Sequence, residues 1–549
     1  MGEERRTIGS LRSERVRGTQ TAKTGTAEVS VVMNEPPSNG PVVAHRWVSL
    51  TAICTAAGMV WLAFGDLGVA IPQIANEFNT SLSNLQWVNN AFSLVTGAFV
   101  IALGKFGDLF GRRRMLQLGI VLLAVFSLPA ALASDVKWLV IGRALMGIGA
   151  ALILPASLAL IPPEFSGKAE TAAFGIWQAV AWGGLSIGPA LSGVITVGLG
   201  WRWLFWINLP LAALTFVVVQ ATTPESRDEK AARTIDWLGL VAIVLAAFAL
   251  LYALTEGPSV GWGDPLIVAL FVATAVLSVG WWFIERRART PLVDLRLFRI
   301  RAYNGALTAN LTMNFTFAGL SFLLVLWLEN ARGYSPVEAG VLMLPATVGV
   351  FLCIPLGGRL DNRWGGRLPS VVGLVVASAG LGLLGSLGTR SSTEYLAVAL
   401  IVIGLGLGLV STPVANTAVG EVPIELAGAA AGVFKMSSML GGALGVAVLT
   451  AIARAFTTQE AAGVVEASGL TQAQISQVRR ALVNSSSFRD AIASLPPDLR
   501  HTVVQAATEA FSSGVADTMA ITAFLALAST VVVFFLWPRR RKATPATPE

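Results

Sequence analysis

Long apolar segments alternate with short polar ones along most of this chain. A stretch of roughly 18 or more residues with few charges is long enough to cross a bilayer as an α-helix. Fourteen stretches fit this description, and charged turns or loops separate them. The expected membrane helices lie at about 50–72, 87–104, 115–134, 138–160, 171–198, 203–221, 235–255, 265–285, 303–328, 337–358, 368–388, 394–416, 427–453 and 516–537.

The composition favours a membrane protein over a soluble one. Hydrophobic residues make up 54% of the chain and charged residues 13%, against about 25% charged residues in soluble domains. We therefore expect an all-α polytopic membrane protein. Residues 1–49 are mostly polar and rich in arginine, without an apolar core after the early charges, which predicts a disordered cytoplasmic tail and not a signal peptide.

The distribution of basic residues predicts the orientation. Of the 39 Lys and Arg residues, 28 lie in tails and loops on the side of the two termini, and four lie in short loops on the other side. Positively charged loops stay in the cytoplasm, so we expect both termini there and the chain in the plasma (inner) membrane. The loop 454–515 carries five more basic residues on the side opposite the termini. This does not contradict the orientation, because long loops cross the membrane largely regardless of charge. Topology, and not nucleic-acid binding, then explains the net charge of +7.

One charged turn occurs twice. Between the second and third apolar segments the chain reads Gly104-Lys-Phe-Gly-Asp108-Leu-Phe-Gly111-Arg112-Arg113-Arg114. The spacing returns 254 residues later as Gly358-x3-Asn362-x2-Gly365-x-Arg367, again between apolar segments. Transporters are often built from duplicated halves with the substrate site between them. In the first copy, the glycines allow close packing, and Asp108 is expected to pair locally or to cap a neighbouring helix end.

This turn resembles the loop signature that joins the second and third helices in the major facilitator superfamily. The resemblance implies two six-helix bundles with two extra central helices between them. It also implies that the turn acts as a conformational latch, formed by Gly104, Asp108, Gly111, Arg112 and Arg113. The implied divisions are a tail at 1–49, a first bundle at 50–221, two linker helices with cytoplasmic loops at 222–302, a second bundle at 303–537 that includes the extracytoplasmic loop 454–515, and a tail at 538–549.

Two further motifs narrow the resemblance. The fifth segment contains Gly184-x3-Gly188-Pro189-x2-Ser192-Gly193, which is similar to the antiporter motif of drug exporters, with Ser192 in place of a glycine. Generic helix packing through small residues is the alternative. The string Trp201-Arg-Trp-Leu-Phe-Trp-Ile-Asn-Leu-Pro210 follows and resembles fourteen-helix drug:proton antiporters, while its tryptophans fit an interfacial belt.

Two charged residues in apolar segments are candidates for proton coupling. Arg143 lies in Leu139-x3-Arg143-x3-Gly147-x-Gly149-Ala-Ala151, which resembles the superfamily's fourth-helix motif, whose arginine is implicated in proton transfer. It must face the bundle interior unless it extends to the interface. The position of the subfamily's usual first-helix acid is Ala63 here, and Asp66 lies about 4.5 Å further along a helix. We expect Asp66 to replace that acid, with a hydrated helix end as the alternative.

Other polar residues within apolar segments are candidates to line a substrate cavity. They are Asn89, Gln178, Asn310, Asn314, Asn416 and Lys435. Hydrogen bonding between helices is the alternative for the amides. Lys435 lies early in the thirteenth segment, where it either extends to the cytoplasmic edge or lines the cavity and favours an anionic or zwitterionic substrate.

These features predict a secondary transporter and not an enzyme. The sequence contains no nucleophile–base pattern, no Cys/His spacing typical of a metal site and no phosphate loop of an ATP-driven pump. We expect a monomer without a cofactor that exports amphipathic or lipophilic small molecules by alternating access, with protons, substrate and membrane lipid as its partners. A dedicated exporter of one lipid or metabolite is the main alternative, and a non-transporting membrane sensor or scaffold is a weaker one.

Overall fold

The structure is a computed structural model. It describes residues 41–67, 70–80, 82–227, 236–288, 291, 293–389, 391–467 and 497–538. The chain divides into two compact units, Met1–Val43 and Ala44–Glu549, and the fold described below is that of the second unit. Its described residues form α-helices with a few short 3₁₀ or π-helical turns.

The apolar pattern predicts the helices well. Thirteen helices in the described ranges are long and apolar enough to cross a membrane, and the count is fourteen when the bent α7 is included as one span. The prediction of an all-α polytopic membrane protein is therefore confirmed.

The first six-helix bundle follows the order of the chain. Its long helices are α1 (Pro41–Gly65), α3 (Leu82–Phe110), α4 (Arg112–Ala131), α5 (Val136–Ala159), α7 (Gly167–Gly198) and α9 (Asn208–Thr222). Three short helices connect them, namely α2 (Ile71–Phe78), α6 (Ile161–Glu164) and α8 (Trp203–Trp206). Within this bundle α5 packs against both α3 and α4, and α4 packs against α9.

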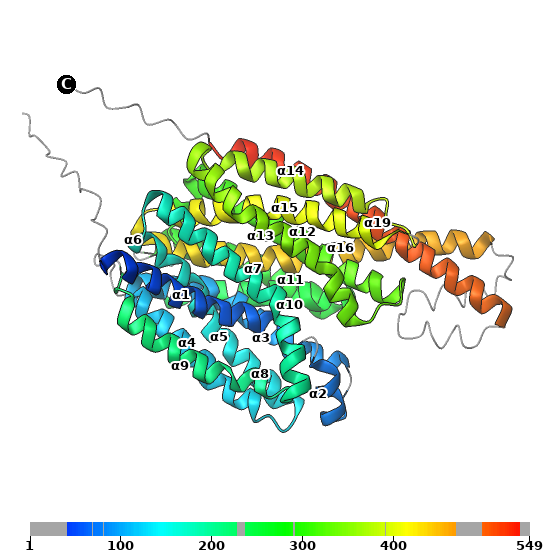
Figure 1. The fold of residues 1–549 in the computed structure, drawn as a ribbon, viewed down its shortest axis with the longest axis horizontal. Coiled ribbons are helices and arrows are strands. Elements are labelled where there is room, and N and C mark those ends of the chain that lie inside the picture. The colour runs from blue at the N-terminus through cyan, green and yellow to red at the C-terminus, as the bar shows by residue number, and fades with distance from the viewer. Residues whose placement is uncertain are drawn as a thin grey trace, which may run out of the picture. The chain divides into compact units, whose positions relative to one another are not determined.

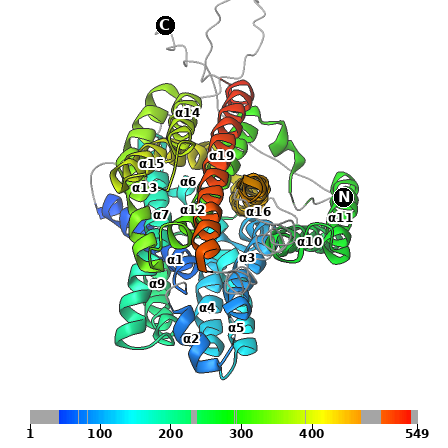
Figure 2. The same cartoon turned by 90° about the vertical axis from the view of Figure 1, so that its right-hand side faces the viewer.

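Two more helices stand between the bundles in the chain. They are α10 (Trp237–Val260) and α11 (Pro265–Arg287). α10 packs against α3 and α16, one helix from each bundle, and α11 packs against α10 (Figure 2). The pair therefore flanks the bundles at the edge and does not line their centre.

The second bundle repeats the arrangement of the first. It contains α12 (Arg301–Asn330), α13 (Pro336–Trp364), α14 (Arg367–Leu384), α15 (Thr393–Ala415), α16 (Ala427–Ala467) and α19 (Pro497–Leu536), with short turns η1 (Leu295–Arg299), η2 (Asn416–Gly420) and η3 (Ile424–Leu426). α13 packs against α15, and α12 against α16. The bundles meet where α3 packs on α16 and α7 on α13 (Figure 1).

Capping residues fix where several helices begin. Asp135 accepts a hydrogen bond of 3.1 Å from the Trp138 N–H at the start of α5. Ser335 and Glu338 form a capping box at the start of α13. Such caps satisfy N–H groups that have no partner inside the helix.

The 454–515 loop differs from the expected one. α16 continues through the apolar stretch to Ala467, and α19 begins at Pro497, so both flanks of this loop are extensions of membrane helices. Figure 1 shows the two helices running past the ends of their neighbours. Alanine, glutamine and glutamate favour the helix here, so loss of hydropathy does not end it. The middle of this loop, 468–496, lies outside the described residues.

Candidate functional site

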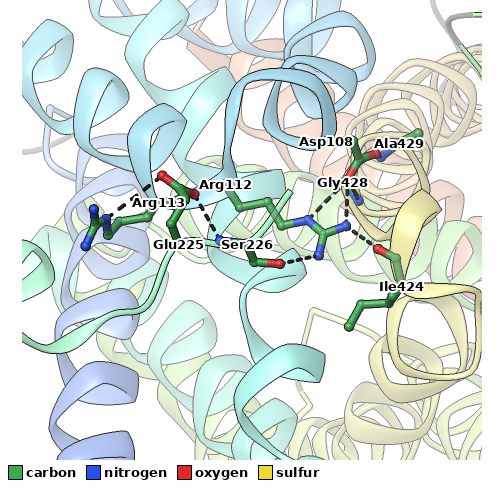
Figure 3. Close-up of polar contacts among 8 residues, drawn as sticks. All are labelled: Asp108, Arg112, Arg113, Glu225, Ser226, Ile424, Gly428 and Ala429. Carbon is green, nitrogen blue, oxygen red and sulfur yellow. Dashed lines mark hydrogen bonds and ion pairs between the residues drawn. The ribbon is translucent and has the colours of Figure 1, made fainter. Parts of the chain in front are cut away.

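The Asp108 carboxylate joins the two bundles. One oxygen accepts a hydrogen bond of 2.9 Å from the Gly428 N–H, and the other accepts one of 2.9 Å from the Ala429 N–H (Figure 3). These N–H groups belong to the first turn of α16, where the helix dipole favours a negative charge. Asp108 is fully buried. A side chain of the first bundle thus caps a helix of the second.

Arg112 completes this contact from the other side of the turn. Its Nη2 donates to Asp108 Oδ1 at 2.8 Å and also to the Ile424 carbonyl, and its Nη1 donates to Ser226 Oγ at 3.0 Å (Figure 3). The guanidinium is 1% exposed. It therefore ties the end of α3, the segment after α9 and the segment before α16 to one another.

Glycines and Glu225 shape the rest of the turn. Glu225 accepts hydrogen bonds from the Arg113 and Arg114 N–H groups at 3.0 and 3.3 Å, which caps the start of α4. Gly111 has φ +109°, and a Cβ there would lie 2.7 Å from the Glu225 carboxylate. A Cβ on Gly104 would lie 2.6 Å from the Gly428 carbonyl oxygen. The five residues expected to form the latch therefore lie at one junction between the bundles.

The second copy of the turn makes a corresponding contact. Asn362 in α13 accepts a hydrogen bond of 2.9 Å from the Thr171 hydroxyl in α7. Its neighbour Asp361 accepts one of 2.7 Å from Asn416 at the start of η2. Each turn thus touches the fifth helix of the opposite bundle, but only the first copy does so with a charge at the repeat position. Asn416 is used in this contact and does not line the central cavity described below.

Asp66 and Arg143 form an ion pair inside the first bundle. α1 ends at Gly65, so Asp66 follows the helix, whereas the expected segment 50–72 would continue past it. Glycine is a poor helix former, which favours an end at this point. Asp66 is 8% exposed and Arg143 is fully buried. The Asp66 Oδ1 lies 3.6 Å from Arg143 Nη2.

The hydrogen bonds of this pair are incomplete. Arg143 Nη2 donates to the Ala63 carbonyl at 2.7 Å and to Asn89 Oδ1 at 3.0 Å. Asp66 Oδ1 and Arg143 Nη1 have no hydrogen-bond partner within the described part of the chain. A buried carboxylate that is poorly satisfied is readily neutralised by a proton. Asn89 therefore contacts the ion pair and is not one of the residues that line the cavity.

α7 packs closely on α1 next to this pair. A Cβ added to Gly184 would lie 2.8 Å from the Trp61 Cβ, and one added to Gly188 would lie 3.3 Å from the backbone of Gly65. Small residues at these positions let two helix backbones approach. Gly184 and Gly188 of the expected antiporter motif thus contact the end of the helix that precedes Asp66.

The same motif spans a bend in α7. The parts Gly167–Gly188 and Leu191–Gly198 are inclined by 41° to each other. Pro189 lies in the break and Gly193 in the second part. A proline removes a helix hydrogen bond, which allows such a bend. α7 therefore changes direction where it leaves α1.

A cavity of about 50 Å³ lies between the bundles. α1, α7, α12 and α16 contribute its lining residues, which are Trp61, Gln178, Ala181, Trp182, Leu185, Asn310, Met313, Asn314, Phe317, Lys435 and Ser438. Sites for drug-sized ligands have volumes of about 300–1,000 Å³. The bundles must therefore separate at this level before such a ligand fits.

Lys435 lies in the wall of this cavity and not at the membrane surface. It is 3% exposed. Its Nζ lies 4.2 Å from the centre of the Trp177 ring and 5.4 Å from that of Trp61. Of the six residues expected to line the cavity, the structure brings together Gln178, Asn310, Asn314 and Lys435.

Comparison with known proteins identifies the family. The Major Facilitator Superfamily profile matches residues 50–446. The chain is 34% identical to multidrug resistance protein Stp of Mycobacterium tuberculosis (strain CDC 1551 / Oshkosh), over 75% of this chain and 77% of that protein. It is 32% identical to the tetracenomycin C resistance and export protein of Streptomyces glaucescens, over 77% and 78%.

The chain belongs to the major facilitator superfamily. The resemblance inferred from its motifs is confirmed, and as a superfamily member the protein is a transporter and not an enzyme. The chain is also 34% identical to puromycin resistance protein pur8 of Streptomyces alboniger, over 75% of this chain and 83% of that protein. The fold is similar to that of the human organic anion transporter MFSD10 (TETRAN) in its crystal structure, with a TM-score of 0.58 and 15% sequence identity. The match covers 92% of this chain and 100% of that one, and this likeness concerns the fold alone.

Sequence reasoning missed a polar network in this superfamily member. Trp201 Nε1 donates to Glu77 Oε2 at 2.7 Å, and Arg202 Nη1 donates to Glu77 Oε1 at 2.5 Å. Trp201 is 1% exposed, so it is a buried donor, whereas Trp203 of the same string is 49% exposed. These two hydrogen bonds hold the pKa of the Glu77 carboxyl below its ordinary value, the indole contributing most. The network fastens α2 to the turn before α8.

The latch partners were also missed. Glu225, Ser226 and Ile424 lie in polar connections that match no motif. The signal for Glu225 was an acid in a loop on the same side of the membrane as the arginine run 112–114.

Proposed function

We propose that this transporter exports small amphipathic or lipophilic molecules in exchange for protons. Relatives named for antibiotic resistance and export support an exporter. The buried Asp66–Arg143 pair is the observation that carries the proton coupling. In this proposal the protein works as a monomer in the plasma membrane, in contact with lipid, and both termini with their basic loops face the cytoplasm.

The ion pair gives a proton a way to move helices. Ionised Asp66 attracts Arg143 of α5, and protonation removes that attraction in a site of low polarity, where it is strong. The end of α1 is then free to shift. α7 follows because Gly184 and Gly188 pack on α1, and α7 also lines the cavity and touches α13 of the other bundle. A proton on Asp66 therefore changes the contact between the bundles.

Coupling requires that the proton and the substrate favour different states of the transporter, one facing outward and the other facing inward. A ligand shifts an equilibrium only by its differential affinity for the two states. We infer that the outward-facing state binds the proton better and that the inward-facing state binds the substrate better. The Asp108 contact with α16 holds the bundles together at the cytoplasmic end and opens when that end admits substrate.

Transport by the purified protein in liposomes tests this function. Liposomes loaded with fluorescent lipophilic dyes, one each of anionic, neutral and cationic charge, would be given an imposed pH gradient. Wild type should move at least one dye only when the gradient is present. Asp66→Asn should lose gradient-driven movement but keep exchange of labelled for unlabelled dye, because an amide at position 66 can neither bind nor release a proton.

A matched control shows whether the loss of gradient-driven movement is specific to the Asp66 carboxylate. Glu329→Gln removes a partly exposed acid at the end of α12, and its transport should equal that of wild type. Gradient-driven movement that survives in Asp66→Asn would place the proton elsewhere. If wild type moves none of the dyes, the substrate is a dedicated lipid or metabolite, and the broad-export proposal fails.

A further inference from the structure

Lys435 is a buried cation that lacks a counter-charge of its own. Within the described chain it forms no hydrogen bond and no ion pair. Its ammonium instead contacts ring faces, 4.2 Å from the Trp177 centre and 4.9 Å from the Phe434 centre. Cation–π contacts of this kind are worth about 0.5–2 kcal/mol, which is less than the cost of removing an ammonium from water. The charge is therefore only partly compensated.

Arg143 shows the contrast within the same molecule. It too is buried in an apolar region, but it is paired with Asp66 and bonded to a carbonyl and an amide oxygen. Lys435 lines a cavity, whereas Arg143 does not. Among the residues that line this cavity, Lys435 alone carries a charge. A counter-ion for Lys435 has to come from whatever occupies the cavity.

A second donor lies in the same wall. The Trp61 Nε1 is buried and has no hydrogen-bond partner among the described residues. Other donors of the cavity are already engaged: the Asn310 amide donates to the Phe434 carbonyl and to Ser438, and the Trp182 indole donates to Ser411. The Lys435 ammonium and the Trp61 N–H are thus two donors of this wall, one of them charged, that form no hydrogen bond within the described chain.

We propose that this cavity selects amphipathic organic anions, such as aromatic carboxylates, phenolates or sulfonates. The anionic group accepts hydrogen bonds from Lys435 and Trp61, and the apolar part lies against Trp182, Phe317 and Met313. Charge-assisted hydrogen bonds are about twice as strong as neutral ones, so the anion gains more than a neutral analogue. An amphipathic cation meets a like charge, which disfavours it. This inference rests on the export function proposed above.

Two dyes of one ring system test the charge preference. A fluorescein-type anion and a rhodamine-type cation share a tricyclic core, and each would be followed out of liposomes that contain the purified, full-length protein under a pH gradient. Wild type should move the anion about tenfold faster than the cation, because one charge-assisted contact in a buried site is worth about 1.5 kcal/mol or more.

Variants at the two donors sharpen the result. Lys435→Gln should reduce anion transport about tenfold and leave cation transport unchanged or raised, while Lys435→Arg should keep much of the anion transport. Trp61→Phe keeps the ring but removes the N–H, and should weaken anion binding several-fold. Lys137→Gln removes the same charge from an exposed position on α5 and should match wild type.

The outcomes separate this inference from the function it rests on. Gradient-driven transport of the cation at least as fast as of the anion overturns the anion preference and leaves the export function standing. An equal loss of both dyes in Lys435→Gln assigns the residue to folding and also overturns it. If Lys435→Gln does not fold, anion binding by Lys435→Arg and Trp61→Phe decides, and unchanged affinity in Trp61→Phe counts against the site. If wild type transports neither dye, the proposed export of amphipathic molecules is rejected, and this inference falls with it.

Discussion

The Asp108 carboxylate and the backbone N–H of Gly428 are joined by a hydrogen bond of 2.9 Å across 320 residues of sequence. The second repeat makes its corresponding contact with a neutral pair, Asn362 and Thr171. Hydrogen bonds to a charged group are stronger than neutral ones. The two repeats thus make corresponding contacts of unequal strength, and the first latch should dominate the closed arrangement.

Asp108→Asn is expected to weaken this latch without unfolding the protein. An amide has one acceptor oxygen and no charge, so it cannot hold both the Gly428 and the Ala429 N–H groups, which costs about 1–3 kcal/mol. The population in which this end is open should rise about tenfold. Labelling of a cysteine introduced as Met313→Cys, with Cys54 and Cys353 replaced by serine, would report the opening through its rate with a membrane-impermeant reagent.

Asp135→Asn is the matched control for that experiment. Asp135 also caps a helix with its carboxylate, but the helix is α5 of its own bundle. Asparagine caps a helix about as well as aspartate, so this variant should change stability little and leave the labelling rate unchanged. Equal labelling in the two variants would mean that Asp108 is only a local cap.

Gly104→Ala should open the same junction by a steric route. The new Cβ would lie 2.6 Å from the Gly428 carbonyl oxygen, and backbone cannot move aside as a flexible side chain can. α3 and α16 must then separate, which lengthens the Asp108 contacts and lowers the transport rate severalfold. Gly280→Ala in α11 is the control, since a Cβ there meets nothing within 4 Å and alanine favours a helix. Equal transport by the two variants would contradict close packing at Gly104.

The Asp66–Arg143 pair should behave as one unit in stability measurements. Arg143→Gln leaves a buried carboxylate without its partner, a change that typically costs about 3–5 kcal/mol. Adding Asp66→Asn removes that charge, so the double variant should have a higher Tm than Arg143→Gln alone. Thermal unfolding of the purified protein in detergent measures this, and Tm losses that simply add would show that the two side chains are not coupled.

The sequence could predict the features that depend on residues close together in the chain. Hydropathy located the helices, and glycine spacing with charge marked the turn at Gly104 and Asp108, because those features act over one or two helical turns. The partners of that turn, Glu225 and Ile424, were missed, since their proximity depends on how distant segments pack.

Two features could not be decided from the sequence, the position of the Lys435 side chain and the end of α1, because neither is fixed by the hydropathy pattern. Lys435 could have extended to the membrane edge or faced the cavity, and only the rotation of α16 against α12 and α7 decides between these. The end of α1 at Gly65 is a balance of small local preferences, so the hydropathy pattern overran it. The sequence predicted that Asp66 and Arg143 both take part in proton coupling. It could not predict their ion pair, because that contact depends on how α1 packs against α5 and α7.

The Glu77 network predicts a pH dependence outside the membrane-spanning segments. Hydrogen bonds from Trp201 and then from Arg202 lower the pKa of Glu77. A group whose pKa is lowered by folding adds stability above its unfolded-state pKa and loses it as the pH falls through the folded-state pKa. The contribution should be full at neutral pH and should decline below about pH 4. Glu77→Gln should therefore lower Tm at pH 7, and its difference from wild type should shrink in acid. Glu329→Gln, outside this network, should show no such pH-dependent difference, and a constant deficit in Glu77→Gln would mean that the ionised carboxylate is not what holds α2.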